Sequence, residues 1–235
     1  PGDGAVLRYR RDAAGRLVEA VREGSRGRTL LGRYRWEGPR LVEAANDTVT
    51  IRYEHDAFGR LAAMEHAFAA LREPPLRWRW HRDLAGRIAV EELPGGYVAR
   101  YAWDGHDVVG IVVEGLPDGP FRVDPAALRD PLALRPPIET DWPPAAPVFE
   151  GGRLVESGDA RHLQDPHGRR ASRRAIDPLR GARDGWFAHH DWRLRAERRA
   201  SGRLRLWLWA GDRPVAAIDD GVPSRIVTDP RGAPV

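Results

Sequence analysis

The chain has 235 residues, and its 38 basic residues, all of them arginine, outnumber its 34 acidic residues to give a formal net charge of +4. This length is sufficient for a sizeable core in one or two domains. The absence of cysteine excludes a disulfide scaffold, cysteine-based zinc sites and cysteine nucleophiles. A charge of +4 over this length does not by itself indicate a nucleic-acid partner.

A nine-residue motif recurs from the start of the chain: an aromatic residue, then Asp three positions later, Gly three positions after that, and Arg followed by an aliphatic residue. Such self-similarity at a regular interval is the sequence signature of a repeat architecture. The full copies contain Tyr9, Asp12, Gly15 and Arg16; Tyr53, Asp56, Gly59 and Arg60; and Trp80, Asp83, Gly86 and Arg87.

The residues that flank each motif predict a β-hairpin. Leu76, Trp78 and Trp80 alternate with polar residues, as expected for a half-buried strand. At the turn, the Asp side chain can accept hydrogen bonds from backbone amides that follow it, and the Gly supplies a positive φ. The Arg after the Gly begins the return strand and can cover an aromatic ring.

Weaker copies of the motif fill the intervals and continue to the C-terminal end. Residues 34–41 keep the ends of the motif, 101–105 keep its first half, and Asp165, Gly168 and Arg169 keep its second half. More degenerate copies lie at 191–194 and 209–213. The spacing corresponds to one unit for roughly every 20 to 25 residues.

The repeat is interrupted by a Pro-rich stretch. Nine prolines fall between Pro117 and Pro147, and proline cannot donate a hydrogen bond within a central strand ladder. We therefore predict three segments: β-hairpin repeats over 1–116, an irregular insertion over 117–148, and further degenerate repeats over 149–235.

The motif resembles the YD repeat of the Rhs family, which includes bacterial polymorphic toxins and the C components of insecticidal Tc toxins. The C-terminal end also resembles the family's last repeat and its entry into the Rhs core. The residues that carry this second resemblance are Thr228, Asp229, Gly232 and Pro234.

The resemblance implies an all-β fold, in which a ribbon of YD-type hairpins forms part of a spiralling shell, or cocoon, around a C-terminal toxin domain. It further implies a structural role in enclosing and delivering the toxin, for example through type VI secretion. The implied partners are the rest of the shell, the enclosed toxin and secretion-machinery proteins. The implied location is the bacterial cytoplasm, followed by export. Self-cleavage and toxin activity would lie beyond Val235, so this chain is expected to be a non-enzymatic piece of a larger protein.

The candidate catalytic and metal-binding residues of the sequence have structural explanations. His189, His190 and Asp191 are the densest metal-like cluster, but adjacent strand residues point to opposite faces, and Asp191 falls at a turn position. No phosphate-binding loop or nucleophile motif is present. We therefore predict no catalytic, cofactor or metal residues and no membrane span in this chain.

The densest basic run provides the sequence argument for an anionic cargo. Arg169, Arg170, Arg173, Arg174, Arg180 and Arg183 lie close together, followed by two aromatic residues, Trp186 and Phe187, that could stack on bases. A solvated strand face is the preferred interpretation, and nucleic acid is not the expected partner. Two other functions remain open: an extracellular YD-repeat module that binds carbohydrate or protein, and a polysaccharide-active enzyme.

Overall fold

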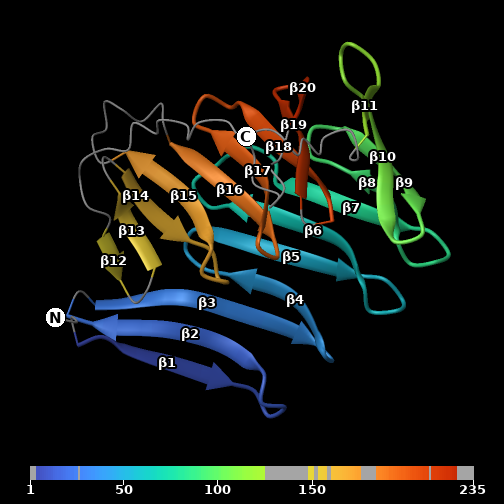
Figure 1. Cartoon of the computed structure of the whole chain (residues 1–235). Helices are drawn as coiled ribbons and strands as arrows, with labels where there is room; N and C mark the ends of the chain where they lie inside the picture. The colour runs from blue at the N-terminus through green and yellow to red at the C-terminus, as the bar shows by residue number, and fades with distance from the viewer. Residues whose placement is uncertain are drawn as a thin grey trace, which may run out of the picture. The chain divides into compact units, whose positions relative to one another are not determined.

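The chain forms an all-β structure of antiparallel strands. The computed structural model describes residues 4–25, 27–124, 148–150, 153–157, 160–175, 184–211 and 213–226. These ranges contain twenty strands and no helix, so a membrane-spanning helix is also absent from them. Strands β1 to β11 follow one another in chain order in one sheet, and β12 to β20 do so in a second (Figure 1). The all-β prediction is confirmed.

The chain divides into two compact units, and unit 1 comprises Pro1–Leu76 and Ala145–Trp186. The side chains of Ala44, Val49, Ile51 and Met64 are buried in its core. Its strands are β1 (Val6–Arg11), β2 (Leu17–Gly24), β3 (Gly27–Glu37), β4 (Arg40–Ala45), β5 (Val49–His55), β6 (Leu61–Phe68), β12 (Val148–Glu150), β13 (Arg153–Ser157), β14 (Ala160–Gln164) and β15 (Arg170–Ala175).

Unit 2 comprises Arg77–Pro144 and Phe187–Val235. On β7 the predicted alternation is confirmed, because Leu76, Trp78 and Trp80 are buried between exposed polar residues. The strands that lie wholly or mostly in unit 2 are β7 (Leu76–Arg82), β8 (Ile88–Glu92), β9 (Val98–Asp104), β10 (Asp107–Glu114), β11 (Phe121–Val123), β16 (Gly185–His190), β17 (Arg193–Arg199), β18 (Leu204–Ala210), β19 (Arg213–Asp219) and β20 (Val222–Arg225).

The Pro-rich range is described only in part. Its beginning contains the short strand β11, which pairs with β10 through Phe121, Arg122 and Val123. Residues 125–147 lie outside the described residues, so the division into 1–116, 117–148 and 149–235 stays a prediction. The predicted core-entry residues Thr228, Asp229, Gly232 and Pro234 also lie outside the described residues.

Candidate functional site

The turn between β1 and β2 shows how the repeated motif closes a hairpin. The Asp12 amide donates to the Arg16 carbonyl at 3.0 Å, and the Gly15 amide donates to the Asp12 carbonyl at 2.9 Å. Oδ1 of Asp12 accepts from the amides of Ala14 and Arg16 at 2.9 Å each, and Oδ2 accepts from Arg16 Nε at 2.7 Å. Gly15 has a φ of 78°, which favours glycine. We call this arrangement the aspartate turn.

Three further turns repeat the arrangement closely. In each, Oδ1 of the Asp accepts from the amide of the following Arg at 2.9 Å, and Oδ2 accepts from its Nε at 2.7 to 2.8 Å. The φ angles of the turn glycines are 81° or 82°. The matching sets are Asp56, Gly59 and Arg60; Asp83, Gly86 and Arg87; and Asp165, Gly168 and Arg169.

The hydrogen bonds of the turn favour the charged form of the aspartate. In Asp12, the hydrogen bond from the Arg16 side chain is the largest influence, and it lowers the pKa of the carboxyl. In Asp56 and Asp83, partial burial raises the pKa, but the hydrogen bonds and positive charge of the following arginine outweigh it. The pKa of both carboxyls is therefore lowered, and the turn binds its arginine as an ion pair.

In two of these turns the arginine also reaches an aromatic ring of the next hairpin. The Arg16 guanidinium carbon lies 5.9 Å from the centre of the Trp36 ring, and that of Arg87 lies 5.7 Å from Trp103. Both tryptophans belong to the hairpin that follows, so each arginine links one hairpin to the next. These distances are typical of cation–π contacts.

The hairpins that carry these tryptophans close by a different turn. Residues 34–41 and 101–105 resemble weakened aspartate turns in the sequence, but their strands are joined by two residues that begin with Gly38 and Gly105, each with a φ of 55°. A Trp-x-Gly pattern at 36–38, 103–105 and 209–211 is the sequence signal for this second class. In each case the Trp Nε1 donates to a backbone carbonyl, that of Leu17, Ile88 or Leu194 respectively.

Sequence reasoning also missed a turn that keeps the aspartate-turn backbone without an aspartate. The Arg199 amide donates to the Arg203 carbonyl and the Gly202 amide to the Arg199 carbonyl, both at 2.9 Å. Gly202 has a φ of 85°. The positive-φ glycine and the following arginine are therefore the retained features of the motif at this position.

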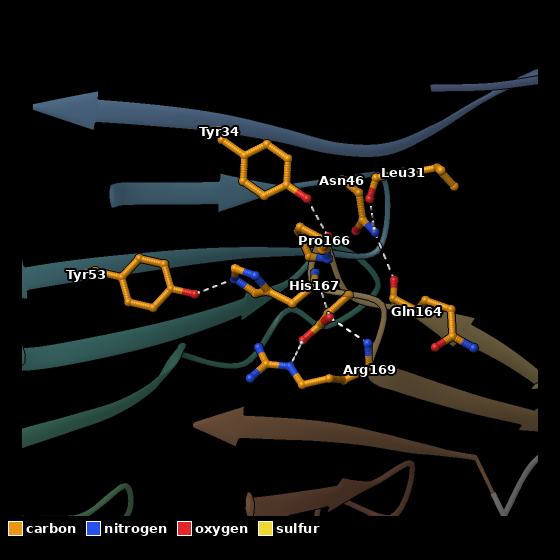
Figure 2. Close-up of polar contacts among 9 residues, drawn as sticks. Leu31, Tyr34, Asn46, Tyr53, Gln164, Pro166, His167 and Arg169 are labelled. Carbon is orange, nitrogen blue, oxygen red and sulfur yellow. Dashed lines mark hydrogen bonds and ion pairs between the residues drawn. The ribbon is translucent and has the colours of Figure 1, made fainter. Parts of the chain in front are cut away.

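The Asp165 turn differs from the other three because it is docked against tyrosines of β3 and β5 in the first sheet (Figure 2). Its aspartate is 2% exposed, whereas the side chain of Asp83 is 26% exposed. Tyr34 OH donates to the Pro166 carbonyl at 2.5 Å, and Tyr53 OH lies 2.7 Å from His167 Nε2. The His167 ring lies between the two tyrosines. Its centre is 6.1 Å from the centre of the Tyr34 ring and 6.3 Å from that of the Tyr53 ring.

Asn46 joins the same two layers next to the docked turn. Its Nδ2 donates to the Gln164 carbonyl at 2.8 Å, while its Oδ1 accepts from the amides of Thr48 and Val49. The side chain therefore closes the turn before β5 through its oxygen. At the same time its nitrogen bonds β14, as Figure 2 shows. Asn46 is the only asparagine in the chain, and no repeat pattern pointed to it.

Unit 2 joins its two sheets through a buried ion pair. Glu91 on β8 and Arg195 on β17 are both buried, and Arg195 Nη2 donates to Glu91 Oε1. Trp80 Nε1 donates to the same oxygen at 2.8 Å, and Tyr101 OH donates to Glu91 Oε2 at 2.7 Å. The Trp80 ring also lies 5.0 Å from the ring of His190. The buried carboxylate thus accepts from three donors.

The ligand-binding interpretations gain no geometric support from the described ranges. No group of three His, Cys, Asp or Glu side chains there could hold a metal ion. Trp186 and Phe187 are buried, so their rings do not form a surface for stacking on bases. Arg169 is paired with Asp165, while Arg180 and Arg183 lie outside the described residues.

Comparison with known proteins gives one curated relative and several solved structures. The chain is 29% identical over 118 residues to double-stranded DNA deaminase toxin A of Burkholderia cenocepacia (strain H111). The matched part covers 49% of this chain and 8% of the relative, so this chain corresponds to a small part of that protein. No family model matches.

The solved structures are similar over most of this chain. The crystal structure of TcdB2-TccC3-TEV aligns over 93% of this chain and 10% of its own, with 10% identity and a TM-score of 0.43. A Photorhabdus luminescens Tc holotoxin pore aligns over 92% of this chain and 10% of its own, with 10% identity and a TM-score of 0.41.

Proposed function

We propose that this chain is a wall segment of an Rhs-type β-shell that encloses a toxin domain and helps to deliver it. The observation that carries the proposal is the aspartate turn, which closes four hairpins through the same set of hydrogen bonds. Such a device lets one chain extend a sheet strand by strand without crossovers, as a wall requires. The match to a toxin, which covers 49% of the chain, agrees with this role.

The proposed role of the chain itself is structural. Its polar clusters hold turns and layers together: the aspartates bind the arginines of their own turns, and Glu91 is enclosed by donors. The deamination named for the curated relative, or any other toxin activity, would belong to another part of the parent protein. The proposed partners are the remaining shell, the enclosed toxin and the secretion machinery, with synthesis in the bacterial cytoplasm and subsequent export.

Limited proteolysis of the complete gene product tests this proposal. If the repeats enclose the C-terminal region, that region will resist protease in the complete product and will be cut rapidly when it is expressed without the repeats. Equal rates of cleavage would contradict enclosure. An extracellular binding module would instead leave the C-terminal region accessible and would retain carbohydrate or protein on the surface of cells that display it.

A further inference from the structure

Two aromatic side chains frame one buried residue on the first sheet in unit 1. Tyr34 on β3 pairs with Ala44 on β4, and Ala44 pairs with Ile51 on β5. Tyr53 lies two residues beyond Ile51, so it faces the same side of the sheet. The small side chain of Ala44 therefore lies between two tyrosines. We call this arrangement an aromatic frame and the residue between the two rings its centre.

The same arrangement occurs in unit 2 with a different centre. Trp80 on β7 pairs with Glu91 on β8, and Glu91 pairs with Ala99 on β9. Tyr101 lies two residues beyond Ala99, so it faces the side of Trp80 and Glu91. Both centres are buried, since Ala44 is 0% exposed and Glu91 is 1% exposed. The two frames thus differ mainly in the chemistry of the centre.

The centre in unit 1 leaves the polar atoms of both tyrosines to the docked turn. Alanine has no polar side-chain atom, so neither hydroxyl can bond to it. Tyr34 OH donates to the Pro166 carbonyl, and Tyr53 OH lies 2.7 Å from His167 Nε2 (Figure 2). The His167 ring lies between the two tyrosine rings, where a small centre leaves room for it.

The centre in unit 2 takes the polar atoms of its frame for itself. Trp80 Nε1 donates to Glu91 Oε1 at 2.8 Å, and Tyr101 OH donates to Glu91 Oε2 at 2.7 Å. The strand that docks here presents a cation, since Arg195 Nη2 donates to the same carboxylate. Arg195 is buried, and a buried guanidinium without its carboxylate is costly.

The repeat itself does not require a charge at the centre. Glu91 stands eight residues after the aspartate of its turn. The same position holds Ala20 in the first aspartate-turn hairpin and Met64 in the second, and both are buried. The carboxylate is therefore individual to one hairpin. Such a difference matters because both sheets consist of similar hairpins, so a shift by one hairpin would bring similar surfaces together.

We propose that the centres Ala44 and Glu91 determine which element of the second sheet docks on each frame. The alanine centre selects the imidazole ring of the Asp165 turn, and the glutamate centre selects the guanidinium of Arg195. A mismatched pair is penalised on both sides: Arg195 over alanine would lose its carboxylate, and His167 over glutamate would meet donors that are already bound. The selection does not depend on the proposed shell function.

A transplant of the unit 2 chemistry into unit 1 tests the proposal. Ala44→Glu is expected to lower the folding equilibrium constant about a hundredfold or more in urea unfolding, because it buries an unpaired carboxylate under the docked turn. Adding His167→Arg supplies the cation and is expected to recover about tenfold or more of this loss. Hydrogen exchange of residues 165–169 is expected to accelerate in the single variant and to slow again in the double variant.

Two controls separate selection from size and from charge alone. Ala44→Met has a similar length without a carboxylate, so His167→Arg should not rescue it. Ala45→Glu places the same charge on the opposite face of β4 and should have little effect. If Ala44→Glu does not fold, recovery of the folded chain on adding His167→Arg is the expected rescue. Additive losses in the double variant, or equal rescue of Ala44→Met, would overturn the proposal.

Discussion

The two units join their layers by different chemistry. In unit 1, the Tyr34 hydroxyl and the Asn46 amide donate to backbone carbonyls of the docked turn and the adjacent strand. In unit 2, the layers meet at a buried carboxylate and guanidinium. Neutral bonds at a partly exposed edge tolerate the loss of a partner because water can replace it. A buried ion pair holds one arrangement strictly, because an unmatched charge in the core is costly.

Removing one charge of the buried pair in unit 2 should have the largest effect on stability. Arg195→Met leaves the Glu91 carboxylate buried without its cation, and we expect a loss of about 3–5 kcal/mol in the free energy of unfolding. Urea unfolding followed by tryptophan fluorescence measures it. Arg100→Met, which removes an exposed pair with Glu114, is the control and should cost at most about 1 kcal/mol.

A double change separates charge from packing at the same place. Glu91→Gln combined with Arg195→Met leaves no unmatched charge and keeps an acceptor for Trp80, so it should be clearly more stable than Arg195→Met alone. Equal losses in the single and double variants would mean that the methionine side chain, and not the unpaired carboxylate, causes the damage.

The aspartate turn occurs both in a buried position, at Asp165, and in a more exposed one, at Asp83. Asp165→Ala removes the acceptor for two amides and the Arg169 side chain at a buried position, and we expect a loss of about 3 kcal/mol. Asp83→Ala removes the equivalent acceptor at an exposed turn, where water can replace it, so the loss should be smaller. Urea unfolding of the two variants measures the difference, and equal losses would show that docking adds nothing to the turn.

The smallest effect we expect is a dependence of the free energy of unfolding on pH, to which one histidine in each unit contributes. Burial lowers the pKa of His190; the charge of Asp191 opposes this shift and that of Arg195 reinforces it. The pKa of His162 is also lowered, by burial and by the positive charges of Arg170 and Arg173. Both folded pKa values therefore lie below the unfolded value of about 6.5. The folded state binds fewer protons, so this contribution to stability is complete above that value and is lost as the pH falls through the folded pKa.

Substitution identifies the share of each histidine. His190→Gln and His162→Gln should each reduce the slope of unfolding free energy against pH below about 6.5. His81→Gln, at an exposed position beside Glu92, is the matched control. A slope that neither buried substitution changes would assign the acid sensitivity to carboxylates.

The sequence predicted those parts of the fold that depend on local chemistry. Asp12, Gly15 and Arg16 determine a turn within a few residues, and alternation along β7 identifies its buried face. Contacts such as Glu91 with Arg195, 104 residues apart, depend on which strands the layers bring together. A buried glutamate in a strand looks the same in the sequence as an exposed one. At residues 101–105 the sequence misled in another way. They resemble the first half of the aspartate-turn motif, but the structure closes this hairpin with a two-residue turn.

The order of the strands has a mechanical consequence. In the described residues, the hydrogen-bonded neighbours of each strand within its sheet are its neighbours along the chain. Pulling on one end would therefore detach an end strand first, and its ladder bonds would be loaded one after another instead of all at once. Each released strand would expose the next as the new edge, so the sheet can be drawn out in sequence without any segment passing through another. Re-formation in the same order requires only short loop closures, which are the fast steps of β-sheet assembly.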